Sequence, residues 1–268
     1  MELGLNGRTC VVTGASRGIG LATARMLCAE GAHVVLAARG AEALEAAASE
    51  CRAAAPERVR VEHLELDVTA ADAGDRVVAF VEQRLGPLDV AVANAGTSRV
   101  RPIEELTDGD WLEQWDLNVM APMRLMRAAA PRMAERGFGR IVNVCSSSGK
   151  RPSQTNAAYS VAKSAQLSLS RAYADAYARR GVLVNAVAPG PVGTSLWLAN
   201  GGLADQTAAA QGISREQALA SAQAKPPLGR FGTDDEIAAA IVFLCSERAA
   251  NVAGAAWSVD GGVVQTIV

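Results

Sequence analysis

The chain has 268 residues, of which 50% are hydrophobic and only 4% aromatic, and its formal net charge is −2 at pH 7. A sequence pI near 5.8 provides no basic field for nucleic acid or an anionic membrane, and no apolar run reaches the roughly 18 residues of a membrane span, so we expect neither partner. Five widely spaced cysteines without a C-x-x-C pair are typical of buried thiols in a reducing compartment, and two histidines are too few for a multi-histidine metal centre, which predicts a cytoplasmic protein without a metal site.

Apolar segments bounded by turn residues alternate along the chain with longer segments of helical periodicity, a pattern that predicts βαβ units and a parallel sheet. The strands are expected at 9–13, 33–37, 59–64, 88–93, 140–145, 182–186 and 255–259. The helices are expected at 18–30, 41–54, 70–84, 110–136, 157–179 and 234–246. No composition break marks a second domain. We therefore expect residues 1–268 to form one α/β domain, a doubly wound Rossmann-type fold whose seven-stranded parallel sheet has helices on both faces.

Residues 194–230 interrupt this alternation with a Gly-Gly pair, a helical segment around 214–222 and a Pro-Pro pair. Because the insertion follows the sixth strand at the carboxyl edge of the sheet, it is expected to form a substrate lid. A plain connecting segment is the alternative. The apolar residues Leu196, Trp197 and Leu198 within it favour a partly apolar ligand, or else an interface with another protein surface.

The first strand runs directly into a glycine-rich segment, Thr13-Gly-Ala-Ser-Arg-Gly-Ile-Gly20, which opens the first helix. Glycines in this context let the backbone approach a pyrophosphate and direct helix N-terminal amides toward it. The residues expected to contact a dinucleotide here are Gly14, Ser16, Arg17, Gly18, Ile19 and Gly20. Taken alone, the same glycines are equally compatible with a tight strand-to-helix turn.

Tyr159 and Lys163 are four positions apart in a predicted helix, so their side chains share one face. A phenol titrates near ~10, and lowering this pKa by roughly three units takes about 4 kcal/mol, which one nearby positive charge can supply. Ser146 lies thirteen residues before the tyrosine and adds a hydroxyl donor. Without Ser146 and the glycine segment, the pair would be read as an ordinary exposed helical pair.

These motifs together resemble those of the short-chain dehydrogenase/reductase family over essentially the full chain. The matching residues are Thr13 to Gly20, Asn94-Ala95-Gly96, Asn118, Ser146, Tyr159, Lys163, Pro189-Gly190 and Thr194. One departure is Ala93, where the family often has a second asparagine. The later segments Pro227-Leu-Gly-Arg230 and Asp260-Gly-Gly262 resemble those of bacterial 3-oxoacyl thioester reductases and their broad-specificity relatives.

The resemblance implies a catalytic set of Asn118, Ser146, Tyr159 and Lys163. Tyr159 would exchange the proton, Ser146 would hydrogen-bond to the substrate oxygen, and Lys163 would lower the phenol pKa and bind the nicotinamide ribose. Asn118 would hold a water that links the lysine to solvent. Ser147 and Ser148 compete for the role of Ser146, and strand alternation would direct Ser146 and Ser148 the same way.

The resemblance also assigns dinucleotide contacts beyond the glycine segment. Asp67 and Val68 would contact the adenine, although Asp67 is equally a candidate helix cap. The backbone of Asn94, Ala95 and Gly96 would pass close to the dinucleotide. The nicotinamide would be bordered by Pro189, Gly190, Val192 and Thr194, together with Tyr159 and Lys163.

The end of the second strand predicts which nicotinamide cofactor is used. An acidic residue there would bind a ribose 2′-hydroxyl and repel a 2′-phosphate, but the chain reads Ala37-Ala38-Arg39. Arg39 and Arg17 provide donors suited to phosphate, so NADP(H) is expected in preference to NAD(H). Solvated surface arginines, and an NAD-dependent alcohol or sugar dehydrogenase of the same family, are the alternatives.

The function that follows is an NADP(H)-dependent oxidoreductase that interconverts a ketone and a secondary alcohol, with the proton from Tyr159. A non-catalytic dinucleotide-sensing protein is the alternative from another class. The glycine spacing disfavours a sugar-nucleotide epimerase. Lys150, Arg151, Gln154 and Asn156 are possible pocket residues, but the substrate is left open. The resemblance further implies a homotetramer formed through the helices that carry Asn118 and Tyr159 and through the carboxyl-terminal strand. The apolar ending at 262–268 suits burial against a second subunit.

Overall fold

Seven parallel strands form a single sheet in the order β3-β2-β1-β4-β5-β6-β7 in the computed structural model, which describes residues 2–265. The sequence of strands reverses direction between β1 and β4, which creates the crevice where doubly wound sheets bind their ligands. The strands are β1 Thr9–Thr13, β2 His33–Ala38, β3 Val61–Glu65, β4 Val90–Ala93, β5 Gly139–Val144, β6 Val182–Pro189 and β7 Ala256–Val259.

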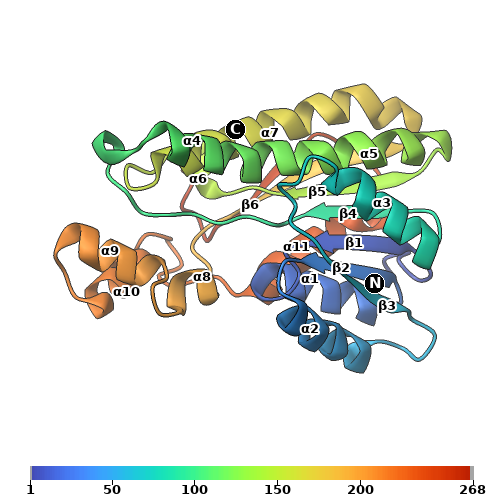
Figure 1. Cartoon of the computed structure of the whole chain (residues 1–268), viewed down its shortest axis with the longest axis horizontal. Coiled ribbons are helices and arrows are strands. Elements are labelled where there is room, and N and C mark those ends of the chain that lie inside the picture. The colour runs from blue at the N-terminus through green and yellow to red at the C-terminus, as the bar shows by residue number, and fades with distance from the viewer. Residues whose placement is uncertain (1, 266–268) are drawn as a thin grey trace.

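Helices cover both faces of this sheet, as Figure 1 shows. On one face lie α1 and α2 with α11, and on the other lie α3, α5 and α7. Alternate residues of β1 supply the two cores, since Cys10 and Val12 pack in the first and Val11 in the second. The helices are α1 Gly18–Ala29, α2 Ala41–Ala54, α3 Ala73–Arg84, α4 Asp108–Trp115, α5 Ala121–Glu135, α6 Ser147–Lys150, α7 Ala157–Tyr177, α8 Ser195–Leu198, α9 Leu203–Gln211, α10 Arg215–Ala224 and α11 Asp234–Cys245.

The predicted α/β fold and the seven strands are confirmed, and most boundaries differ by only a few residues. The prediction of one continuous helix at 110–136 was wrong. The helix begins earlier, because Thr107 and Asp110 form a capping box, and it is interrupted by a π-helical turn at Asp116–Met120. Asn118 explains the interruption, since its side-chain Nδ2 donates to the Gln114 carbonyl at 3.1 Å, the acceptor an α-helix would use for the Asn118 backbone N–H.

The segment expected to form a lid contains the three helices α8, α9 and α10, which extend beyond the sheet at one end of the molecule in Figure 1. The helix predicted at 214–222 is α10, and Ser214 with Gln217 forms its capping box. Gln206 of α9 accepts a hydrogen bond from the Val100 backbone N–H at 3.0 Å, so the segment reaches the loop between β4 and α4.

All five cysteines are buried and free, as expected. Among residues 2–265, no helix has the length and apolar character needed to cross a bilayer. Positions 266–268 of the apolar ending, which the sequence assigns to a subunit interface, lie outside the described residues.

Candidate active site

The glycine segment after β1 adopts a backbone that only glycine fits. Gly14 and Gly18 have φ of +66° and +56°, in the left-handed region that favours glycine. A Cβ on Gly20 would lie 2.4 Å from the Gly14 carbonyl oxygen, and one on Gly14 would lie 2.8 Å from the Ala95 Cα. The loop therefore packs directly against the end of β4, and its last backbone amides lie at the start of α1.

Thr13 and Asn94 hold this loop to the end of β4. The Thr13 Oγ1 accepts from the backbone N–H groups of Asn94 and Ala95 at 3.0 and 3.2 Å. The Asn94 Nδ2 in turn donates to the Thr13 carbonyl at 2.9 Å and the Gly14 carbonyl at 3.2 Å. Sequence reasoning expected Asn94 only beside the dinucleotide, whereas its side chain shapes the glycine loop. It did not single out Thr13, although the hydroxyl's place at the end of β1 was a usable signal.

The end of β6 closes the opposite side of the same loop. A Cβ on Gly18 would lie 3.3 Å from Thr194 Cγ2, which places this threonine beside the glycine segment. The Thr194 backbone N–H donates to the Val192 carbonyl at 2.7 Å, and a Cβ on Gly190 would lie 2.8 Å from the Asp260 Cα. The structure thus brings together the three segments that the sequence assigned to one dinucleotide site.

Arg17 and Arg39 are both exposed, Arg17 as the N-cap residue of α1 and Arg39 just after β2. One oxygen of Asp67 accepts from the Thr69 backbone N–H at 2.9 Å and from its hydroxyl at 2.7 Å, which closes a local turn. The alternative reading of Asp67 as a helix cap is wrong, because α3 begins at Ala73 with Asp72 as its N-cap. The two bonds from Thr69 are the main reason the pKa of Asp67 lies below its usual value, and the nearby positive charge of Arg39 adds to the effect.

Ser146 is the serine that meets Tyr159. It is the N-cap of α6, and its Oγ accepts from the Ser148 backbone N–H at 3.1 Å. The expected strand alternation does not apply here, because β5 ends at Val144 and α6 starts at Ser147. A hydrogen bond between the Ser146 and Tyr159 side chains lowers the pKa of the phenol.

The pKa of Tyr159 nevertheless rises to about 12, because burial disfavours the phenolate more strongly than the Ser146 hydrogen bond favours it. Lys163 is not among the groups that shift this pKa in the structure, so its expected effect on the phenol stays a prediction. The Lys163 Nζ lies 5.7 Å from the centre of the Tyr159 ring and donates instead to the Val144 carbonyl and to Gln166 Oε1, both at 2.8 Å. Tyr159 consequently retains its proton at neutral pH.

Lys163 is almost fully buried, with 2% of its surface exposed, and burial lowers its pKa to about 8. The ammonium group therefore keeps its charge at pH 7 but loses it under mildly alkaline conditions. Gln166, three residues along α7, was missed by sequence reasoning although its helical spacing places it on the same face as Lys163.

Asn118 lies in the π-helical turn and is fully buried. Its Nδ2 donates to both the carbonyl and the Oε1 of Gln114, whereas its Oδ1 has no hydrogen-bond partner among the described side chains and backbone groups. A Cβ on Gly96 would lie 3.1 Å from this Oδ1 and 3.6 Å from Lys163 Nζ, so both polar atoms face the same glycine. π-Turns of this kind are frequent at functional sites.

A dinucleotide fits the residues present. The glycine loop has no room for side chains, and the turn into α1 presents backbone amides of the kind that bind phosphate. The unpartnered Asn118 Oδ1 and the buried Lys163 ammonium provide an acceptor and a donor on the far side of the crevice. Within residues 2–265, no group of three or more His, Cys, Asp or Glu side chains is arranged to hold a metal ion.

Comparisons with known proteins decide the family. Residues 8–200 match the family described as short chain dehydrogenase. The chain belongs to this family. It is 35% identical over 263 residues to gluconate 5-dehydrogenase of Gluconobacter oxydans (98% of this chain, 97% of the relative) and 38% identical over 261 residues to a putative ketoacyl reductase of monensin polyketide synthesis from Streptomyces virginiae (96% and 97%).

Its structure also superimposes on L-sorbose reductase from Gluconobacter frateurii, solved with NADPH and L-sorbose, with a TM-score of 0.91, 36% identity and 100% coverage of both chains. This short-chain dehydrogenase is accordingly an oxidoreductase.

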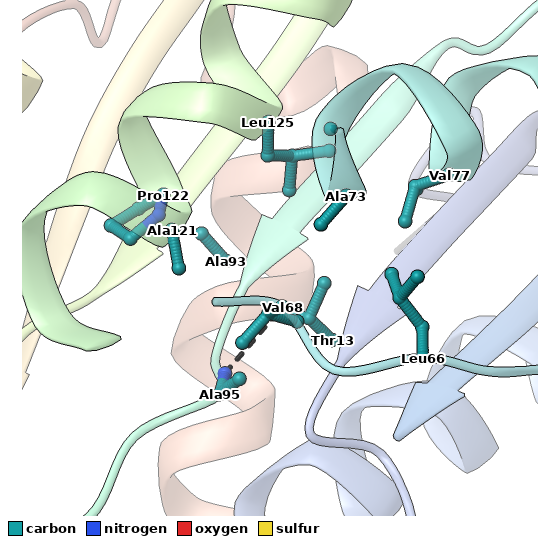
Figure 2. Close-up of a pocket in the computed structure, with 11 residues that line it drawn as sticks. Thr13, Leu66, Val68, Ala73, Val77, Ala93, Ala95, Ala121, Pro122 and Leu125 are labelled. Atoms are coloured by element: carbon teal, nitrogen blue, oxygen red, sulfur yellow. Dashed lines mark hydrogen bonds between the residues drawn. The ribbon is translucent and has the colours of Figure 1, made fainter. Parts of the chain in front are cut away.

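One pocket of this short-chain dehydrogenase lies between the ends of β1 and β4 and the helices α3 and α5 (Figure 2). Its lining is almost wholly apolar, and Figure 2 shows Val68 and Ala95 on one side with the Ala95 backbone bonded to Thr13. The remaining lining residues are Leu66, Ala73, Gly74, Val77, Ala93, Ala121, Pro122 and Leu125.

A second pocket, here called the polar cleft, contains Tyr159 itself. The other residues that line it are Arg99, Arg101, Leu106, Asp110, Glu113, Gln114, Asn156 and Ala158. Of the four possible pocket residues named from the sequence, Asn156 lines this cleft, whereas Lys150 is bonded to the Ala256 carbonyl at 2.6 Å and to Ser258 Oγ at 3.0 Å. The charged residues after Gly96 were missed, although their place directly behind β4 was a signal.

Proposed function

We propose that this short-chain dehydrogenase reduces a ketone to a secondary alcohol with NADPH, and catalyses the reverse oxidation with NADP⁺. The observation that carries the proposal is the grouping of Ser146 and Tyr159 beside the buried Lys163, where Ser146 follows the end of β5 and the Lys163 Nζ lies 5.7 Å from the centre of the Tyr159 ring. Gluconate 5-dehydrogenase and the putative ketoacyl reductase among its relatives support the reaction class, and L-sorbose reductase, solved with NADPH, supports the cofactor as well.

The side chains of the site stabilise the substrate oxygen and supply the proton. When bound, the nicotinamide supplies the hydride. Ser146 donates a hydrogen bond to the substrate oxygen, and this bond strengthens as negative charge develops there. Tyr159 gives its phenolic proton to that oxygen, which completes the alcohol. A phenol whose pKa is raised to about 12 is protonated at neutral pH and is therefore ready to act as a general acid.

Lys163 and Asn118 prepare Tyr159 for the next turnover. The Lys163 ammonium binds the ribose hydroxyls and stabilises the phenolate left after proton transfer, because it is the nearest buried positive charge on the same helix. The unpartnered Asn118 Oδ1, which faces Gly96 together with Lys163 Nζ, holds a water through which a proton returns from solvent.

The other parts of NADP(H) are assigned to the segments that meet at the crevice. The backbone of Gly14, Ser16, Gly18, Ile19 and Gly20 holds the pyrophosphate, and the backbone of Asn94, Ala95 and Gly96 passes beside the ribose. Asp67, through its second carboxylate oxygen, and Val68 at the apolar pocket hold the adenine. The nicotinamide is bordered by Pro189, Gly190, Val192 and Thr194.

Arg17 and Arg39 set the preference for the phosphorylated cofactor. Both are exposed on the loops that follow β1 and β2, and no carboxylate ends β2. A 2′-phosphate between two guanidinium groups gains charge-assisted hydrogen bonds that NAD(H) lacks. If the protein is instead an NAD-dependent alcohol or sugar dehydrogenase, its turnover with NADH should equal or exceed its turnover with NADPH.

The direct test is a screen of ketones that follows the absorbance of NADPH and NADH, with Ser146→Ala and the exposed control Ser49→Ala. We expect NADPH-dependent turnover, a loss of about a hundredfold or more in kcat for Ser146→Ala, and no loss for the control. Tight NADPH binding without turnover of any carbonyl compound would instead identify a dinucleotide-sensing protein.

We further propose that the chain acts as a single catalytic domain with a lid at 194–230, and that it assembles as a cytoplasmic homotetramer. Leu112 and Trp115 of α4 and Val161 of α7 support the assembly, because they are 67%, 43% and 47% exposed on two helices that contact each other. An apolar surface of this kind favours burial against a second subunit. Light scattering at low micromolar concentration tests the mass.

A further inference from the structure

The polar cleft beside Tyr159 is lined by residues of α4 and α7 and of two loops that are bonded to each other. The Arg101 backbone N–H donates to the Thr155 carbonyl at 3.0 Å, and Asn156 Nδ2 donates to Ser98 Oγ at 3.0 Å. The lid helix α9 joins the same structure through the bond between Gln206 and the Val100 backbone. These three hydrogen bonds hold residues 98–101, and with them the wall of the cleft that carries Arg99 and Arg101, in place.

The charges on this wall cancel in pairs. Arg101 Nη1 lies 2.7 Å from Asp110 Oδ2, and Arg99 Nη2 lies 3.1 Å from Glu113 Oε1. An anionic substrate finds no unpaired positive charge here. A hydrocarbon chain would strip water from four charged groups without replacing its hydrogen bonds, which is unfavourable. Hydroxyl groups, which both donate and accept, are the ligand groups that such pairs can accommodate.

Gln114 connects this wall to the catalytic residues. It lines the polar cleft, it is 5% exposed, and its Oε1 accepts from Asn118 Nδ2 at 3.0 Å. Because that oxygen is used, the group that Gln114 offers to a ligand is its amide NH₂. A hydroxyl acceptor bound in the cleft would thus be hydrogen-bonded to the same side chain that orients Asn118.

We propose that the polar cleft binds the hydroxylated carbons of a neutral polyhydroxylated ketone or alcohol. In this assignment Gln114 and the Arg99–Glu113 pair recognise hydroxyls next to the reacting carbonyl, and Gln114 also acts as a positioning residue for Asn118. The assignment rests on the proposed reductase function and specifies its substrate class.

The first experiment compares substrates of matched length in the wild-type enzyme with NADPH. The set is a neutral ketohexose, 2-hexanone, a six-carbon keto acid of the sugar series and a short 3-oxoacyl thioester. We expect the highest kcat/KM for the ketohexose. A higher value for 2-hexanone, the thioester or the keto acid would overturn the assignment while leaving the reductase function intact.

A binding measurement separates failure of this assignment from failure of the proposed function. Calorimetric titration of the ketohexose into the Tyr159→Phe variant with NADP⁺ measures binding without turnover. Saturable binding supports the cleft assignment even if no carbonyl compound is reduced by the wild type. An absence of binding in this variant, with the protein folded and cofactor bound, would contradict the assignment.

The second experiment tests Gln114, Arg99 and Glu113 by the ratio of kcat/KM for ketohexose to kcat/KM for 2-hexanone. A purely structural change would lower both values and leave this ratio unchanged. Gln114→Leu and the double variant Arg99→Leu/Glu113→Leu should each lower the ratio of kcat/KM for ketohexose to kcat/KM for 2-hexanone by about threefold to tenfold, as expected for one lost hydrogen bond. The matched control Asp72→Leu/Arg76→Leu removes an exposed ion pair on α3 and should leave the ratio unchanged. Equal losses for both substrates would refute hydroxyl recognition.

Discussion

Replacing Lys163 with methionine should change how the stability of this enzyme depends on pH. Lys163 is 2% exposed, and burial lowers its pKa from 10.5 to about 8. Between these two values the unfolded chain holds a proton on this lysine that the native protein has released. The free energy of unfolding therefore rises with pH across this window, and Lys163 is least favourable to the native state below pH 8.

The size of the effect follows from the pKa. Each pH unit between about 8 and 10.5 contributes about 1.4 kcal/mol, so a measurement at pH 9.5 should find Lys163 about 2 kcal/mol more favourable than at pH 7. Other buried groups act in the opposite direction. Burial raises the pKa values of Cys145 and Tyr159 to about 12, so their contribution is lost as the unfolded chain ionises at high pH. These groups are present in both proteins, so the difference in pH dependence between the wild type and Lys163→Met gives the contribution of Lys163 alone.

The assay is urea unfolding of the wild type, Lys163→Met and the exposed-lysine control Lys225→Met at pH 7 and pH 9.5. Between pH 7 and pH 9.5, the free energy of unfolding of the wild type should rise by about 2 kcal/mol relative to that of Lys163→Met. The control should follow the wild type. The constant cost of leaving the Val144 carbonyl and Gln166 unpaired cancels in this comparison. Identical pH dependence in wild type and Lys163→Met would refute the burial argument.

Three further predictions concern the cofactor and the reaction. Arg39→Asp should lower kcat/KM for NADPH by about a hundredfold while NADH is used equally well or better, because a charge-assisted bond to the 2′-phosphate is replaced by repulsion. Steady-state kinetics with both cofactors check this, and an unchanged ratio of kcat/KM for NADPH to kcat/KM for NADH would contradict it. Gly20→Ala places a Cβ 2.4 Å from the Gly14 carbonyl and should destabilise the protein by about 1–3 kcal/mol in thermal unfolding, whereas Gly40→Ala, with open space around it, should have little effect. For ketone reduction, kcat/KM should fall as pH rises through about 8, where Lys163 loses its proton, and a profile that is flat to pH 10 would exclude a role for the ammonium in the free enzyme.

The sequence was sufficient to predict the fold because the strands are short, mostly apolar segments that lie between turn residues and alternate with helical patterns. β1 is buried at every position, for example, and it is followed at once by the glycine loop. The ordered motifs and their spacing also predicted that the catalytic residues lie in one crevice. Local pattern and chain order were enough for these features.

Features that depend on three-dimensional burial could not be predicted in this way. Helical spacing placed Tyr159 and Lys163 on one face, but it did not reveal that Lys163 bonds to Val144 and Gln166 or that burial outweighs the Ser146 hydrogen bond. The π-helical turn depends on Asn118 competing for a backbone carbonyl, which periodicity does not encode.

The polar cleft was missed for a related reason. Its lining comes from α4, α7 and two loops, segments that are far apart in sequence, as the bond between Asn156 and Ser98 across 58 positions shows. No single stretch of sequence carries a pattern for such a surface.

The most direct test of the account is the turnover of Tyr159→Phe, measured together with its affinity for NADPH. The substitution removes only the phenolic oxygen that holds the proton and bonds to Ser146. We predict a loss of at least about a hundredfold in kcat for ketone reduction, with NADPH binding and thermal stability close to those of the wild type. Ketone reduction by this variant at a rate near that of the wild type would contradict the assignment of Tyr159 as the proton donor.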